Sequence, residues 1–178
     1  MTVEAGGSST NYIVVDSKIS VNDYVSYIKS AGSHQSANSE WKNNCLSFAE
    51  TYAYDLYKGT KTEPTKAATY KCGGSFNTVH PTTEEETLQV IYNELINGKP
   101  CVLQVNSGPS GKVRHFVTVV GFKKGAFQSN ITQKDLLIID CADGKISRMD
   151  LAGSRFMTTG EDCDKDYKGY YVRTIAQD

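Results

Sequence analysis

The stretch CVLQVNSGPSGKVRHFVTVVGFKKGAFQSNITQKDLLIIDCADGKISRMDL, residues 101–151, decides the fold class of this chain. Its short apolar and β-branched runs alternate with glycine and polar turns, which is typical of strands. We expect strands over CVLQV (101–105), HFVTVVGF (115–122), DLLIID (135–140), KISRMDL (145–151) and, further on, GYYVRTI (169–175). The pair Asp143-Gly144 is a strong hairpin signal between two of these runs. The second half of the chain is therefore predicted to form an antiparallel sheet of about five strands.

The preceding part of the chain has a helical pattern instead. Apolar residues at helical spacing predict helices over 20–32, 44–59 and 83–98, each ending at a glycine, and the second has one apolar face. Thr83 and Glu86 stand at the spacing of a capping box, which is typical of a helix start.

Two further segments complete the prediction. Residues 12–16, YIVVD, favour a short strand, and residues 59–82 have no clear period and many turn formers, so we expect a long loop there. Helices followed by an antiparallel sheet make an α+β fold. We predict a single domain over 1–178, which consists of a lead-in (1–19), a mainly helical part (20–100) and a mainly antiparallel sheet (101–178).

Composition excludes several classes of partner. The 178 residues include 19 basic and 20 acidic ones, for a formal net charge of -1. No stripe of lysine and arginine is present to release counterions from nucleic acid, so a nucleic-acid partner is not expected. No run reaches the ~18 apolar residues of a membrane span, and MTVEAGGSST lacks the pattern of a secretory signal. A cytoplasmic protein, one exported otherwise or carried by a phage particle, and an excised domain all stay open.

The five cysteines are Cys45, Cys72, Cys101, Cys141 and Cys163, an odd number that cannot pair completely within one chain. No two are two residues apart, and none has histidines at zinc-ligand spacing, so a structural zinc site is not expected. Cys101 and Cys141 lie in apolar strand-like runs and are predicted to be buried in the core. Cys72 and Cys163 lie in polar segments and are a candidate disulfide.

Cys45 has the neighbourhood of a nucleophile. It falls in the first turn of the second predicted helix, after WKNN. The positive end of a helix lowers the pKa of a thiol, and its unpaired N–H groups can donate to an oxyanion. The alternative is a buried helical cysteine without a chemical role.

His115 and Asp140 are the candidate partners of Cys45. His115 opens the run HFVTVVGF, and Asp140 ends the next run, DLLIID. If these strands pair antiparallel, the start of one lies beside the end of the other, and the carboxylate can orient the imidazole. The alternatives are a surface histidine at a strand end and an aspartate that only starts the CADG turn.

The same residues resemble a known group of proteins. A helix-borne cysteine followed by a histidine at a strand start and an aspartate at the next strand end is similar to the papain-like cysteine peptidase clan. Within it, the blocks NGKPCVLQVN, RHFVTVVGF and LLIIDCADGKI resemble the bacterial double-glycine-leader (bacteriocin-processing) peptidase-like family, over roughly residues 40–150. The segment NNCLSFA also resembles the CHAP amidases and peptidases, which act on bacterial cell walls. The resemblance implies a papain-like fold and a catalytic triad of Cys45, His115 and Asp140.

The chain departs from the papain-like pattern at two places. Six residues before the nucleophile, where the pattern has an oxyanion-hole glutamine, it has Ser39, and the hairpin proline is replaced by Cys141. Asn38 is the nearest substitute for the glutamine, and Gln35, Asn43 and Asn44 are further candidates.

Other chemistry-bearing residues have less specific surroundings. His34 and His80 lie in polar segments and are expected to be solvated, although His80 could line the cleft. Trp41, four residues before Cys45, either walls a substrate groove or packs in the core.

The expected activity is hydrolysis of an amide or peptide bond through a thioester, with no metal or organic cofactor. A bacterial or phage enzyme that cuts peptidoglycan is the first expectation for the substrate. Processing of a double-glycine leader peptide is the second. The third alternative is an inactive papain-like module with a binding or structural role.

Overall fold

An antiparallel sheet is the centre of the fold, as the second half of the chain predicts. The structure, a computed structural model, describes residues 2–5, 8–71, 75–107, 113–128, 130–149, 156–157 and 170–176. Within these residues the strands are β1 (Thr2–Ala5), β2 (Ser8–Val14), β3 (Phe76–Val79), β4 (Cys101–Ser107), β5 (Val113–Lys123), β6 (Leu136–Asp140), β7 (Lys145–Arg148), β8 (Phe156–Met157) and β9 (Val172–Ile175).

The strands pair in the order β1-β2-β5-β4-β9-β3, with β6 joined to β5 and β7, and β8 joined to β4. Every pairing is antiparallel. The described residues therefore form a sheet of nine strands, more than the five or so predicted. The additional strands β1, β3 and β8 are too short to show a period, and they exist because a neighbouring strand supplies their hydrogen bonds.

The four α-helices are α1 (Val21–Ala31), α2 (Cys45–Lys58), α3 (Pro64–Thr69) and α4 (Glu84–Ile96). The predicted starts are confirmed, since Ser20 Oγ accepts from Asp23 N at 3.1 Å and Thr83 Oγ1 accepts from Glu86 N at 3.1 Å. The return bond of the expected capping box is displaced by one residue, because the Glu86 carboxylate accepts from Thr82 N.

The prediction of a long loop over residues 59–82 is wrong in two places. Pro64 stands at the start of α3, where its missing N–H costs nothing, and Ala67 and Ala68 of this helix are buried. β3 then pairs with β9. Both elements are shorter than the window over which a helical or alternating pattern can be recognised.

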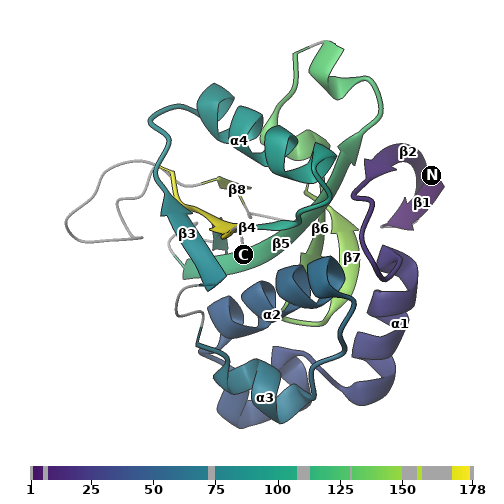
Figure 1. The fold of residues 1–178 in the computed structure, drawn as a ribbon, viewed down its shortest axis with the longest axis vertical. Coiled ribbons are helices and arrows are strands. Elements are labelled where there is room, and N and C mark those ends of the chain that lie inside the picture. Colours follow the sequence, from purple (N-terminus) through teal and green to yellow (C-terminus); the bar gives the residue numbers. More distant parts are fainter. Residues whose placement is uncertain are drawn as a thin grey trace.

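The helices cover the sheet on two sides (Figure 1): α4 lies on one side of the central strands, and α1, α2 and α3 lie on the other. Phe48, Tyr52 and Leu56 of α2 are fully buried. Burying a side chain such as Phe or Leu contributes roughly 1.5–3 kcal/mol each. This packing fixes α2, and thus its first residue, relative to the sheet.

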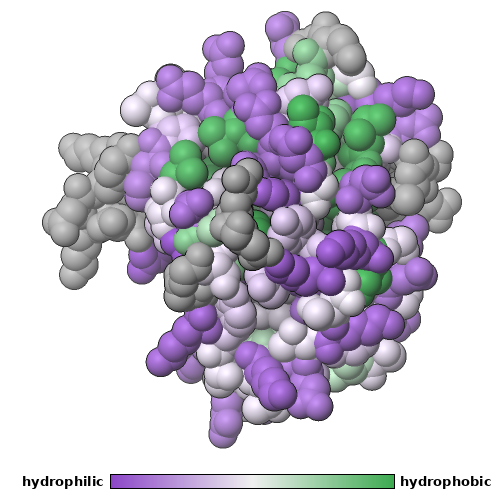
Figure 2. Space-filling view, viewed as in Figure 1, coloured by the Kyte–Doolittle hydropathy of each residue, from purple (hydrophilic) through white to green (hydrophobic). Residues whose placement is uncertain are grey.

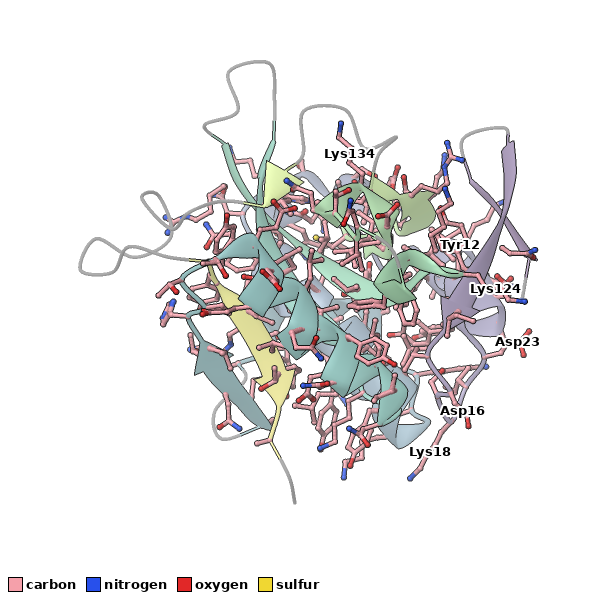
Figure 3. The ribbon with its side chains drawn as sticks, turned by 90° about the horizontal axis from the view of Figure 1, so that it is seen from above. Tyr12, Asp16, Lys18, Asp23, Lys124 and Lys134 are labelled. Atoms are coloured by element: carbon pink, nitrogen blue, oxygen red, sulfur yellow. The ribbon has the colours of Figure 1, made fainter. Side chains whose placement is uncertain are left out.

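The N-terminal strands β1 and β2 form one end of the sheet, where β2 pairs with β5. Tyr12 pairs with Lys123, and Lys124 N donates to the carbonyl of Asn11 at 2.9 Å. Figure 3 shows Tyr12 and Lys124 close together on this side of the molecule, with Asp23, Asp16 and Lys18 further along it. This end of the sheet is built from the lead-in predicted at residues 1–19.

The outer surface has a mixed character. On the face drawn in Figure 2, apolar residues form separate patches in the upper half among hydrophilic ones, and the lower half is mainly hydrophilic. Among the described residues, the large apolar side chains that are exposed are Ile13 and Ile96. None of the helices in that part of the chain has the length and apolar character that a bilayer crossing requires.

Candidate active site

Cys45 lies at the first residue of α2, as predicted, and is half-buried. It lines a cavity of about 850 Å³ together with Gln35, Ser36, Lys42, Asn43, Leu46, Arg114, His115, Phe116, Ala142 and Tyr171. Asn44, the residue that precedes the helix, makes no side-chain capping bond. The amino end of α2 therefore keeps N–H groups and positive partial charge next to the sulfur.

The antiparallel pairing of β5 with β6 brings His115 and Asp140 together. Asp140 pairs with Val117, so His115 is its diagonal neighbour across the two strands. His115 Nε2 lies 2.8 Å from Asp140 Oδ1, and each residue is 8% exposed.

Asp140 makes both of the contacts that the sequence posed as alternatives. Its Oδ1 also accepts from the backbone N–H of Ala142 at 2.9 Å, which starts the turn before β7. Gly144 completes this turn with a φ of 71°, and a Cβ there would lie 2.4 Å from Ile28 Cγ2. The hairpin predicted at Asp143-Gly144 thus also fixes the orientation of the carboxylate.

The electrostatics of Cys45 and His115 are coupled. Burial raises the pKa of the Cys45 thiol, whereas the hydrogen bond and charge of His115 lower it. The lowering by His115 and by backbone bonds outweighs burial, so the pKa lies below the ordinary value of a thiol. Burial lowers the pKa of His115, and bonds to the sulfurs of Cys141 and Cys45 raise that pKa to about 9. Between these two pKa values the pair is a thiolate beside an imidazolium, the reactive form of such a site.

Cys141 is a second sulfur at the same histidine. It is fully buried, as predicted for a core cysteine. Its Sγ lies 3.8 Å from His115 Nε2, 3.1 Å from the Phe116 carbonyl and 3.5 Å from Gln35 Oε1. Burial raises the pKa of this thiol more than His115 lowers it, so the pKa of Cys141 lies above that of an ordinary thiol, in contrast to that of Cys45.

Gln35 and Asn43 bring side-chain amides to the cavity, whereas Asn38 does not. Asn38 Oδ1 accepts from Glu40 N at 3.0 Å, and Asn38 does not line the cavity. Gln35 Nε2 donates to the carbonyls of Trp41 at 3.2 Å and Lys42 at 2.9 Å. The chain reversal between residues 35 and 45 thus brings to the cavity a glutamine that lies ten residues before Cys45.

The remaining candidates lie outside the cavity lining. Trp41 packs its ring on Phe48 with centroids 5.5 Å apart, which favours the packing role. His34 bonds Ser36 Oγ at 2.9 Å. His80 contacts the ring of Tyr171, a cavity residue, with centroids 5.2 Å apart, but does not itself line the cavity. The candidate disulfide of Cys72 and Cys163 lies outside the described residues.

Two residues of this site have no clear signal in the sequence. Gln35 stands at an unexpected spacing, and Cys141 resembles any cysteine in an apolar run. The sequence points to them only through its departures from the papain-like pattern. Ser39 stands where the pattern has its glutamine, which leaves that role open for Gln35, and Cys141 stands where the pattern has a proline.

Comparison with known proteins gives one family. The model of the Peptidase_C39 like family matches residues 9–161, a range that includes Cys45, His115 and Asp140. No curated protein matches the chain.

Proposed function

Because the chain belongs to the Peptidase_C39 like family, we propose that it is a cysteine hydrolase in which Cys45, His115 and Asp140 act as a catalytic triad. The observation that carries this proposal is the position of His115, which contacts Cys45 and Asp140 beside one cavity. A base that touches both a nucleophile and an orienting carboxylate is the arrangement that acyl transfer requires.

The proposed reaction begins with attack of the Cys45 thiolate on an amide carbonyl. Since Nε2 of His115 faces Asp140, Nδ1 is the nitrogen available to the sulfur and the substrate. The imidazolium donates its proton to the leaving amine, which leaves a thioester on Cys45. His115 then takes a proton from water, the hydroxide attacks the thioester, and the acid product and the Cys45 thiolate are released.

The proposed oxyanion donors are the Cys45 N–H and the Gln35 side chain. Gln35 replaces the sequence-based candidate Asn38 in this role because it lines the cavity and is buried, whereas Asn43, which also lines the cavity, is exposed. Its Nε2 has two hydrogens, and the longer of its two resting bonds, 3.2 Å to the Trp41 carbonyl, is the one that an oxyanion would displace. One such donor is worth about 10²–10³-fold in kcat in other acyl-transfer enzymes.

Peptidoglycan cross-peptides are the substrate class that we propose first. Lys42 and Arg114 line the cavity, and no acidic residue of the described chain does. Leu46, Phe116 and Tyr171 supply apolar surface in the same cavity. A peptide that carries free carboxylates beside an apolar segment is complementary to this lining.

Processing of a double-glycine leader peptide is the second candidate, and the resemblance of the histidine and aspartate blocks to that family favours it.

The decisive measurement is the pH dependence of alkylation by iodoacetamide, with the modified cysteine identified by peptide mass. We expect Cys45 to react fastest of the cysteines and already at a pH below that of a free thiol, because His115 lowers its pKa. Reactivity should change again near pH 9, where His115 loses its proton. Cys101, fully buried with a raised pKa, is the internal control and should stay unlabelled.

The same preparation then tests hydrolysis. Purified peptidoglycan and a synthetic peptide with a Gly-Gly site are each incubated with the wild-type protein and with Cys45→Ala. We expect the wild-type protein to cut peptidoglycan and Cys45→Ala to cut neither substrate. If Cys45→Ala retains full activity, the mechanism is wrong. If Cys45 labels only near pH 8–9 and neither substrate is cut, the chain is an inactive module.

A further inference from the structure

Three potential metal ligands converge on one point beside the cavity. His115, Asp140 and Cys141 each offer one ligand atom, and these atoms all lie within 4.8 Å of one another. His115 Nε2 is 2.8 Å from Asp140 Oδ1 and 3.8 Å from Cys141 Sγ. All three residues are buried. We propose that they form a binding site for a thiophilic divalent cation, above all Zn²⁺, whose occupation disables His115.

The geometry is close to that of a zinc site. Zinc binds nitrogen and oxygen at about 2.0–2.2 Å and sulfur at about 2.3 Å, so neighbouring donor atoms in a tetrahedral site are roughly 3.3–3.8 Å apart. The separations of His115 Nε2 from the other two donor atoms, 2.8 and 3.8 Å, bracket this range. Side-chain movements of less than ~1 Å would therefore open the cluster around an ion.

The position of Cys141 makes the cluster possible. Neighbouring residues of a strand normally point to opposite faces, so Asp140 and Cys141 would not share a partner within a strand. Here β6 ends at Asp140, and Cys141 is the first residue of the turn that leads to β7. Both side chains therefore reach His115.

The donor set selects the type of ion. A thiolate, an imidazole and a carboxylate suit Zn²⁺, whereas Mg²⁺ and Ca²⁺ prefer oxygen alone. On binding, the Cys141 thiol gives a proton to the solvent and becomes an anionic thiolate, and the His115 imidazolium gives its Nε2 proton to the solvent and becomes a neutral imidazole. Each then donates an electron pair to the cation.

Occupation of the site would remove His115 from acid–base chemistry. With Nε2 bound to the cation, Asp140 no longer orients a protonated imidazole, and the imidazolium that favours the Cys45 thiolate cannot form. The site does not use Cys45, so metal binding and the proposed catalysis can be tested separately.

The test uses Co²⁺ as a spectroscopic substitute for Zn²⁺ in the full chain, with a phosphine reductant. We expect one Co²⁺ to bind with a thiolate-to-cobalt charge-transfer band and tetrahedral d–d bands, and Zn²⁺ to displace it. Cys141→Ser should lose the charge-transfer band and bind at least about 100-fold more weakly, since even residues behind the ligands are worth 10–100-fold. Asp140→Asn should weaken binding while keeping the band.

Two control variants locate the ion. Cys45→Ala and Cys101→Ala should bind Co²⁺ like the wild-type protein, and thermal unfolding shows whether Cys141→Ser is folded. If Cys45→Ala loses the band while Cys141→Ser keeps it, the ion is held at the nucleophile. If both keep it, the ion is bound by other residues. Either result, or no binding by the wild-type protein, overturns the proposal. If the proposed catalytic role of Cys45 is wrong, Cys45 is alkylated no faster than a free thiol. That result would leave Co²⁺ binding by His115, Asp140 and Cys141 unchanged.

Discussion

The buried pair His115–Asp140 and the buried pair Arg173–Glu50 are alike in charge but differ in the residues that surround them. His115 and Asp140 join β5 to β6 at 2.8 Å, with both residues 8% exposed. Arg173 of β9 and Glu50 of α2 are joined at 3.1 Å, with 9% and 1% of the residues exposed. Distance and burial are nearly the same.

The neighbours of the two pairs separate their roles. His115 borders the cavity and contacts the sulfurs of Cys45 and Cys141. Arg173 instead donates to Thr78 Oγ1 on β3 and lies over the ring of Phe76, 5.9 Å from its centroid. The Arg173–Glu50 pair thus links α2, β9 and β3 away from the cavity lining. A buried ion pair indicates chemistry only where a nucleophile and open space adjoin it.

The largest effect is expected from His115→Ala. Hydrolysis should fall roughly 10⁴-fold, equivalent to about 5.5 kcal/mol, because the reaction loses its acid and base. Unfolding temperature should change little, since water from the cavity can solvate Asp140, which keeps its bond from Ala142 N. The measurements are hydrolysis rate and thermal unfolding. His80→Ala is the matched control and should stay active, because His80 contacts the ring of the cavity residue Tyr171 but does not itself line the cavity.

Glu50→Gln should show the reverse pattern. Without its carboxylate partner, Arg173 is a buried charge that is no longer compensated, which costs about 3–5 kcal/mol of unfolding free energy. The rate of Cys45 alkylation in the folded protein should stay near the wild-type rate. Denaturant unfolding measures the loss, and the double variant Glu50→Met with Arg173→Met should recover most of it. If Glu50→Gln is as stable as the wild-type protein but its Cys45 is alkylated slowly, the Arg173–Glu50 pair acts on the chemistry and not on stability, and the proposed difference between the two pairs is wrong.

The smallest effect is expected from Asp140→Asn. An amide oxygen can still accept from His115 Nε2 but carries no charge to stabilise the imidazolium. Because a neighbouring opposite charge is worth about 1–3 pKa units, hydrolysis should fall about 10–100-fold. The upper limb of the pH–rate profile, set by a His115 pKa of about 9, should move to lower pH. An unchanged profile would mean that Asp140 serves only the turn.

Part of this site could be predicted because its signals are local. Cys45 follows WKNN at a helix start, and His115 and Asp140 stand at the ends of apolar runs. Side-chain alternation and turn residues act over a few neighbours, so the sequence carries them directly. Burial of Cys141 was predictable for the same reason, but its partner was not.

The rest depends on contacts between distant segments. Gln35 N donates to the Cys141 carbonyl at 2.9 Å, and Ser36 N donates to the Ala142 carbonyl at 3.0 Å. These bonds dock the segment before α2 on the turn after β6, and they bring Gln35 to the cavity in place of Asn38. No local period encodes such docking, because its stability comes from two segments about 100 residues apart.

The sequence by itself determined the α+β fold, the ends of its main elements, and Cys45, His115 and Asp140 as candidates, since helix caps, alternation and turn chemistry are properties of short stretches. Only the tertiary structure decided that Cys141 shares His115 with Asp140 and that Glu50 meets Arg173. Cysteine spacing argued against a zinc site, yet folding placed three possible ligands within 4.8 Å. Ligand spacing in sequence reports only on ligands held by one local motif, whereas strand pairing and turns bring together residues that the sequence keeps apart.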